Sequence, residues 1–212
     1  MQSGNTLEVG RADEEPGGLD DAAWARARSA RLTRYWSGAA APPARHAEAR
    51  ALWSDDALLL RFACRQEEPL VVSPEPALDR KTIGLWDRDV CEIFVAPDPS
   101  APTRYFEFEA APTGEWHDLA VEKTATGREA DWEFRSGMTV DARVADDSVT
   151  VAMRIPWGGL GRRPTAGARW RANLFRCVGA GPGRGYLAWR PTYAPEPNLH
   201  VPERFGWLRF AG

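Results

Sequence analysis

The chain contains 212 residues, with 27 lysines and arginines against 30 aspartates and glutamates, a formal net charge of -3. This length suits one domain, residues 1–212, with a sizeable core. The balanced charge argues against nucleic acid or an anionic membrane as the principal partner, because both are bound through concentrated positive charge. We expect a monomer that binds neither.

The N-terminal sequence has neither the basic nor the apolar region of a signal peptide, and no apolar run in the chain is long enough to cross a bilayer. We therefore expect a soluble, cytoplasmic protein, or a secreted one if the sequence was trimmed. Cys64, Cys91 and Cys177 occur singly inside strand-like runs, in an odd number. This pattern predicts buried free thiols in a reducing compartment.

The first predicted element is a short helix within residues 18–27, where an aspartate can cap an alanine-rich turn that carries Trp24. Strands then dominate, and residues 66–84 form a long surface loop between two of them. Some nine or ten short strands separated by turn signals predict an all-β fold, an antiparallel β-sandwich of jelly-roll or immunoglobulin-like type. The clearest strands are residues 47–53, 58–64, 90–95, 105–110, 114–121, 138–144, 149–155, 170–177 and 205–210.

Residues 85–118 are predicted to form a β-hairpin, in which two strands flank a proline-rich connection, and the predicted function depends on them. In the first strand, Glu92 interrupts an otherwise apolar face, because alternate residues of a strand point to opposite sides. The second strand has an apolar face and an acidic face, and Glu107 and Glu109 lie on the acidic one, the usual place for solvated side chains. Trp86 precedes Glu92 by six residues. An indole beside a fixed carboxylate suits a sugar, whose ring faces are apolar and whose edges carry hydroxyls.

Several motifs along the chain resemble the family 9 carbohydrate-binding modules in their stand-alone bacterial form. The most specific is WDRDVCEIFV at residues 86–95, with YFEF at 105–108. Weaker matches are LDDAAW at 19–24, WSDDALLLRF at 53–62 and HVPERFG at 200–206. Together these motifs span nearly the whole chain.

The resemblance implies a β-sandwich that holds the end of a mono- or oligosaccharide between two aromatic rings, with charged and amide side chains on the hydroxyls. Trp86 matches the first ring and Glu92 a sugar-binding carboxylate. For the second ring and the amide, the corresponding C-terminal loop offers Trp189, Tyr193 and Asn198. The family's arginine is replaced here by Glu107 or Glu109, and we include Glu107 among the expected carbohydrate-binding residues.

The resemblance also implies a non-catalytic role linked to carbohydrate catabolism, because such modules are often associated with glycoside hydrolases acting on O-glycosyl bonds. Members of the family carry structural calcium. Four loop aspartates offer oxygen donors but lack the alternating spacing of a dedicated calcium loop; they are Asp87, Asp89, Asp98 and Asp118. We predict no obligate cofactor and no metal ligand, and leave structural calcium open.

Three alternatives remain at this stage. A glycoside hydrolase would use Glu92 with Glu107 or Glu109 as its acid and base. A haem-binding sandwich would draw its iron ligands from methionine and histidine side chains, of which Met138, Met153, His117 and His200 are available. A sandwich with a structural or partner-binding role would need none of these residues for chemistry.

Overall fold

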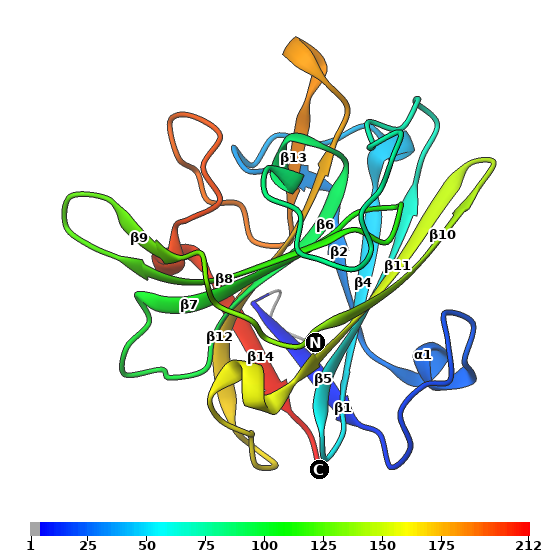
Figure 1. The fold of residues 1–212 in the computed structure, drawn as a ribbon. Helices are drawn as coiled ribbons and strands as arrows, with labels where there is room; N and C mark the ends of the chain where they lie inside the picture. Colours follow the sequence, from blue (N-terminus) through cyan, green and yellow to red (C-terminus); the bar gives the residue numbers. More distant parts are fainter. Residues whose placement is uncertain (1–4) are drawn as a thin grey trace.

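Two β-sheets packed face to face form the fold in the computed structural model, which describes residues 5–212 (Figure 1). The first sheet has the strand order β10-β11-β5-β4, and β2 pairs with β4. Its strands are β2 (Ser29–Leu32), β4 (Ala47–Trp53), β5 (Ala57–Arg65), β10 (Thr139–Ala145) and β11 (Ser148–Pro156). No helix among residues 5–212 has the length and apolar character needed to span a membrane.

The second sheet has the order β14-β12-β6-β7-β8-β9, with β13 and β3 attached beside β12. Its strands are β3 (Arg34–Tyr35), β6 (Val90–Ala96), β7 (Arg104–Ala110), β8 (Trp116–Lys123), β9 (Arg128–Asp131), β12 (Arg169–Val178), β13 (Gly185–Ala188) and β14 (Gly206–Phe210). The predicted all-β sandwich is confirmed. The predicted hairpin of the central stretch is the antiparallel pair β6–β7.

Strand β1 (Thr6–Arg11) joins the two sheets. Its first part pairs with β14 and its last two residues pair with β4, in both cases in parallel. Leu7 and Val9 are buried, while Thr6, Glu8 and Gly10, which alternate with them, are partly exposed. This alternation identifies a strand before the first element predicted from the sequence, and it adds parallel pairs to otherwise antiparallel ladders.

The main core lies between the sheets. From β6 it receives Cys91, Ile93 and Val95, and from β5 it receives Leu58, Leu60 and Phe62, in each case alternate residues of one strand face. The three cysteines are buried free thiols, as predicted, and the sulfur atoms of Cys64 and Cys91 lie 3.6 Å apart across the sandwich.

The predicted helix is present as α1 (Ala22–Arg26). The side chain of Asp21 accepts a hydrogen bond from the backbone N–H of Ala23, which caps the helix. Trp24 is buried against Leu52 and Leu59, so the helix covers the outer face of the β4–β5 pair.

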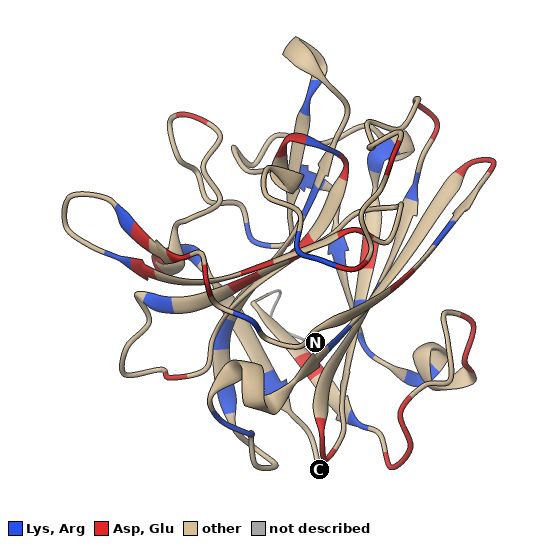
Figure 2. Ribbon diagram, in the orientation of Figure 1, with Lys and Arg blue, Asp and Glu red and all other residues tan. Residues whose placement is uncertain are grey.

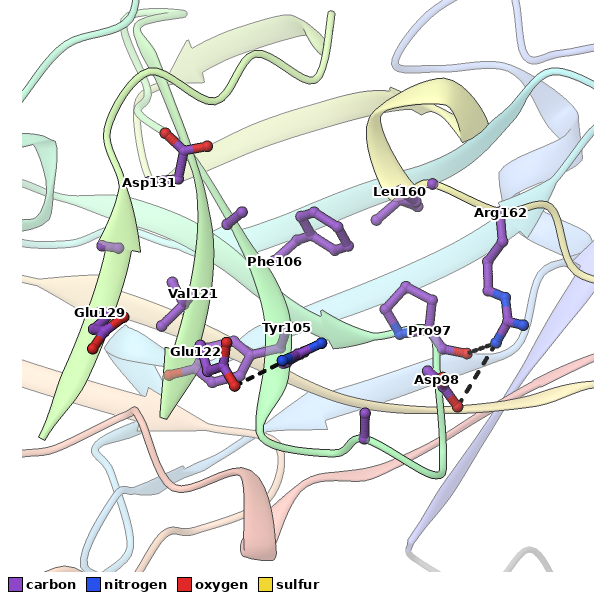
Figure 3. A pocket seen from close by; sticks show the side chains of 15 residues that line it. Pro97, Asp98, Tyr105, Phe106, Val121, Glu122, Glu129, Asp131, Leu160 and Arg162 are labelled. Carbon is purple, nitrogen blue, oxygen red and sulfur yellow. Dashed lines mark hydrogen bonds and ion pairs between the residues drawn. The ribbon is translucent and has the colours of Figure 1, made fainter. Parts of the chain in front are cut away.

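Lysines and arginines alternate with aspartates and glutamates along the strands and loops of the described chain (Figure 2). A cavity of about 730 Å³ opens beside β7, β8 and β9, and the 3₁₀ turn Trp157–Leu160 contributes Leu160 to its wall (Figure 3). Phe106 and Leu160 line it, while the charged groups at its rim pair with one another, as Arg104 does with Glu122. None of the predicted site residues lines this cavity.

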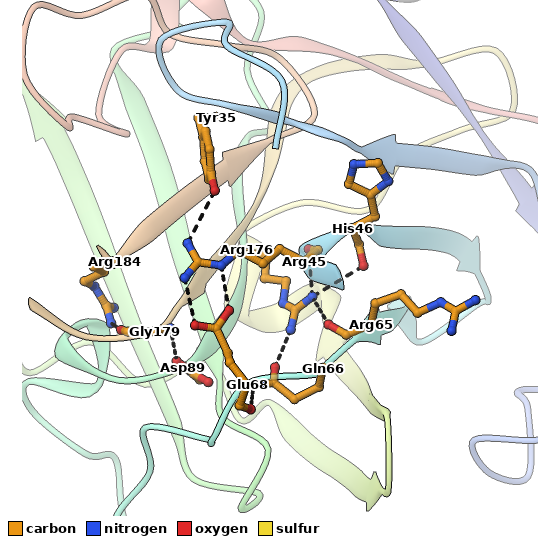
Figure 4. Close-up of polar contacts among 10 residues, drawn as sticks. All are labelled: Tyr35, Arg45, His46, Arg65, Gln66, Glu68, Asp89, Arg176, Gly179 and Arg184. Atoms are coloured by element: carbon orange, nitrogen blue, oxygen red, sulfur yellow. Dashed lines mark hydrogen bonds and ion pairs between the residues drawn. The ribbon is translucent and has the colours of Figure 1, made fainter. Parts of the chain in front are cut away.

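Arg176 is a charged side chain buried inside the sandwich, with 3% of its surface exposed. Its guanidinium donates hydrogen bonds to the carbonyl oxygens of Arg45 and Arg65, at 2.8 and 2.6 Å, and to the side chain of Gln66 (Figure 4). These bonds tie β12 to the start of the 66–84 loop.

We expect Arg176→Met to lower the free energy of unfolding by about 3 kcal/mol, because several buried acceptors lose a charged donor at once. Arg65→Met is the matched control, since the Arg65 side chain is 62% exposed and its backbone carbonyl is retained; it should change stability by less than about 0.5 kcal/mol. Urea unfolding followed by tryptophan fluorescence measures both, and equal effects would contradict the assignment.

Candidate functional site

Three glutamates converge on the outer face of the second sheet, away from the main core. Glu92 on β6 stands directly opposite Glu109 on β7, and Glu107 is two residues before Glu109 on the same face. One carboxylate oxygen from each lies within 4.8 Å of the others. The strand periodicity predicted the face shared by Glu107 and Glu109, and the pairing of β6 with β7 adds Glu92 to it.

These three carboxylates are buried, however, with exposed fractions of 2%, 4% and 0% for Glu92, Glu107 and Glu109. The expectation that the β7 glutamates form a solvated face is therefore wrong. The reason is tertiary: segments distant in sequence fold over this face and exclude water from it.

One covering segment is the loop that follows β13. Leu199 packs against two apolar clusters of the outer face, one around Phe94 and one around Leu85. His200 lies over Phe94, its Nδ1 is 2.8 Å from the hydroxyl oxygen of Tyr105, and its Nε2 is 3.9 Å from a carboxylate oxygen of Glu107. This loop therefore forms one wall of the acidic site.

The other covering segment carries Trp86, in the 3₁₀ turn Leu85–Asp87. The half-buried indole contacts the ring of His117 edge-on at 5.4 Å between centroids and lies 6.1 Å from the ring of Trp132. His117 stands opposite Glu109 in the register of β7 and β8. Trp86 thus lies beside the acidic face, as its spacing from Glu92 predicted.

Hydrogen bonds from distant arginines fix the loop that ends at Trp86 (Figure 4). Arg45 holds Glu68 near the start of the loop through two hydrogen bonds of 2.6 and 2.7 Å. Arg184 donates to the carbonyl oxygens of Trp86 and Arg88 near its end. Trp86 is therefore held in place by its backbone and leaves part of its ring accessible.

Burial dominates the electrostatics of the acidic site. Desolvation, followed by the charge of Glu107, raises the pKa of Glu92 to about 8. Desolvation also raises the pKa of Glu107 and of Glu109, and for Glu109 the neighbouring glutamates add to the effect. Desolvation lowers the pKa of His117 to about 4 and that of His200 to about 3.

The structure does not bring together Trp189, Tyr193 and Asn198, the C-terminal candidates for the second ring and the amide of the sugar site. Trp189 packs against the main core, with its ring over Gly206, on the opposite side of the sheet from Glu92. Tyr193 is 58% exposed and shares a cavity of about 410 Å³ with Trp189. Asn198 accepts a hydrogen bond from the backbone N–H of His200 and so belongs to the wall of the acidic site.

The loop aspartates considered for calcium are separate from one another and have other partners. Asp89 accepts from the backbone of Gly179, and Asp118 pairs with Lys81 at 2.8 Å. Asp98 bonds to Ser100 in its own loop, and Asp87 is exposed. Among residues 5–212, the group of three acidic side chains near enough to share an ion is the glutamate cluster instead.

Sequence reasoning missed Trp132, which is 46% exposed. Together with Trp116 it lines a cavity of about 710 Å³, whose remaining walls are apolar or charged: Asp79, Arg80, Lys81, Ile83, Glu133 and Arg135. Lys81 fixes this region because its buried ammonium donates to the carbonyl oxygens of Asp118 and Phe134. The sequence signal that could have identified Trp132 as a candidate binding residue was its position in an otherwise polar segment.

The buried carboxyls make stability depend on pH. With EDTA present to remove divalent cations, we expect the free energy of unfolding to decrease as the pH rises from about 6.5 to about 8, since glutamates with raised pKa values stabilise the folded chain only while protonated. Each such carboxyl contributes a slope of up to about 1.4 kcal/mol per pH unit. Below pH 6.5 the lowered pKa values of His117 and His200 work in the opposite direction.

Urea unfolding at several pH values measures this dependence, and Glu109→Gln should flatten the alkaline side of the curve. The exposed Glu129 provides the control substitution, Glu129→Gln. A wild-type stability that stays constant or increases from pH 6.5 to 8 would contradict the assignment.

Solved structures of carbohydrate-binding proteins are similar to this chain. No curated protein matches the chain. A proposed carbohydrate-binding protein from Bacteroides uniformis is similar in structure, with a TM-score of 0.75 and 17% identity, covering 98% of this chain and 100% of that one. A family 9 carbohydrate-binding module from Caldicellulosiruptor kristjanssonii was solved with cellotriose and with glucose. These two structures have TM-scores of 0.66 and 0.64, are 16% identical, and cover 98% of this chain and 94% and 96% of theirs.

The family comparison covers nearly all of the fold described above. The model of the carbohydrate family 9 binding domain-like family matches residues 17–208, from the turn before α1 to the last strand. This chain therefore belongs to the carbohydrate family 9 binding domain-like family.

Proposed function

We propose that this protein binds the end of a saccharide, without cleaving it, against the rings of Trp86 and Trp132. The observation that carries the proposal is the pairing of a half-buried and an exposed indole, 6.1 Å apart, beside a cavity of about 710 Å³. The family and the sugars bound by the structural relative support it.

Stacking supplies most of the expected affinity. The C–H groups of a sugar ring pack against an indole face, and burying this apolar surface is favourable. Hydroxyl groups add less, because each exchanges a hydrogen bond to water for one to the protein. Asp79, Arg80 and Glu133 line the adjoining cavity and offer donors and acceptors for those hydroxyls.

Glu92 and Glu107 take a secondary place in this proposal. Both are almost fully buried, so a sugar hydroxyl reaches them only when the Trp86 segment or the His200 loop moves aside. The second ring is Trp132 in place of Trp189 or Tyr193, because Trp189 lies on the other side of the sheet. Asn198 remains near the acidic face through its bond to His200.

The alternatives receive less support from the geometry. A glycoside hydrolase holds its two carboxyl groups on either side of a bound sugar, whereas Glu92, Glu107 and Glu109 approach one another within 4.8 Å in a buried cluster. Haem ligation by methionine and histidine would need them together, yet Met138 and Met153 lie in the main core. Monomeric state, cytoplasmic location and a link to carbohydrate catabolism remain predictions.

Isothermal titration calorimetry with glucose, cellobiose and cellotriose tests the proposal. We expect wild-type protein to bind at least one of them saturably, and Trp86→Ala and Trp132→Ala each to weaken binding about tenfold or more, as loss of a stacking ring removes at least ~1.4 kcal/mol.

Trp207→Ala is the control, because Trp207 is a partly exposed tryptophan on β14 whose ring packs under Arg169 and Arg171. Circular dichroism establishes that each variant is folded. Saturable binding that is unchanged in both ring variants would place the sugar elsewhere, and no binding to any of the sugars would remove the proposal for this ligand class.

A further inference from the structure

The glutamate cluster holds more buried carboxyl oxygens than its surroundings satisfy with hydrogen bonds. Within residues 5–212, both carboxylate oxygens of Glu109 and one of Glu107 are buried and accept no hydrogen bond from any other residue, so these two side chains have only each other as partners. Glu92 accepts one hydrogen bond, from the thiol of Cys177 at 2.9 Å. Buried acceptors in folded proteins are almost always satisfied, so three unsatisfied oxygens at one point indicate that a partner is missing.

Arg184 is the cation whose charge acts on both Glu92 and Glu109. Its guanidinium, however, donates its hydrogen bonds to the backbone carbonyl oxygens of Gly179, Trp86 and Arg88. It therefore anchors the loop and leaves the carboxylates without an ion pair to it.

Two histidines adjoin the cluster and provide an independent observation. His117, with 0% of its surface exposed, stands directly opposite Glu109 on the same face of the sheet. The hydrogen-bonding group recorded near its ring is the backbone of Thr82, which leaves one buried ring nitrogen without a partner among the described residues. His200 directs its Nε2 toward Glu107, 3.9 Å from the carboxylate oxygen, while its Nδ1 is engaged by Tyr105. The hydrogen bond between Nδ1 of His200 and Tyr105 fixes the orientation of the ring, as a hydrogen bond to the other ring nitrogen commonly does for metal-binding imidazoles.

We propose that Glu92, Glu107 and Glu109 bind a divalent first-row transition-metal ion, with an imidazole of His200 or His117 as the additional ligand. Carboxylate oxygens together with imidazole nitrogen suit Mn²⁺, Fe²⁺ or Zn²⁺, whereas Ca²⁺ takes oxygen ligands alone. Bonds of about 2.1 Å place oxygens on opposite sides of one ion about 4.2 Å apart, so small side-chain rotations suffice to close the three carboxylates, which already lie within 4.8 Å of one another. The imidazole of His200 joins them from 3.9 Å away from Glu107.

The ion would also have a structural effect. It would hold β6 and β7 to each other and, through His200, to the loop that carries Asn198. The sugar is proposed to contact the rings of Trp86 and Trp132, whereas the metal ion would lie beneath them among the carboxylates. The metal proposal therefore does not depend on the carbohydrate proposal.

Isothermal titration calorimetry with MnCl₂, ZnCl₂ and CaCl₂, after EDTA treatment and dialysis, tests the proposal. We expect wild-type protein to bind one Mn²⁺ or Zn²⁺ per chain more tightly than Ca²⁺, and its melting temperature to rise when the ion is added. Glu109→Gln should weaken Mn²⁺ and Zn²⁺ binding at least tenfold. In the metal-free state the same variant should melt at or above the wild-type temperature, because it has lost one of three mutually repelling groups.

The unchanged or increased melting temperature of metal-free Glu109→Gln distinguishes loss of a ligand from loss of the fold. Glu122→Gln is the control for adventitious binding, because Glu122 is a 46% exposed carboxylate on the neighbouring strand β8; its affinity should equal that of the wild type. Absence of saturable Mn²⁺ and Zn²⁺ binding by the wild type, unchanged binding by Glu109→Gln, or preference for Ca²⁺ would overturn the proposal. The titration contains no sugar, so its outcome is separate from that of the carbohydrate proposal.

Discussion

Burial of like charges on one strand face is the constraint on which the site depends. Glu92, Glu107 and Glu109 are placed together by the pairing of β6 with β7, and the covering loops remove the water that would otherwise separate their charges. In a medium of low polarity such a group is stable only if it shares protons or binds a cation. The surrounding loops, with Trp86 on one side and His200 on the other, are therefore part of the same electrostatic arrangement.

The arrangement also keeps apart the two sites that we propose, one for a sugar and one for a metal ion. The outer rings of Trp86 and Trp132 offer apolar surface to a ligand from solvent, while the carboxylates beneath them are closed off. What the chain can bind therefore depends on the side chains at these two levels and not on the fold alone.

The features of the fold and the site that could be predicted from the sequence are those set by local residue patterns. Strand alternation placed Glu107 and Glu109 on one face, and the spacing of Trp86 from Glu92 placed the indole near the first strand, because both depend on near neighbours in the sequence. The register that sets Glu92 opposite Glu109 came from the structure. Their burial depends on His200 and Leu199, almost a hundred residues away, and no local pattern reveals that packing. The same limitation applies to β1, whose partners are the last strand and β4.

The position of β1 has a mechanical consequence. From Thr6 to Val9 it runs parallel to β14, from Trp207 to Phe210, so the chain enters this pair at one end and leaves it at the other. A pulling force applied through the two ends acts along both strands in opposite directions and loads all their hydrogen bonds together. The bonds then fail in shear, as a group, and the same two strands that join the two sheets resist extension of the chain.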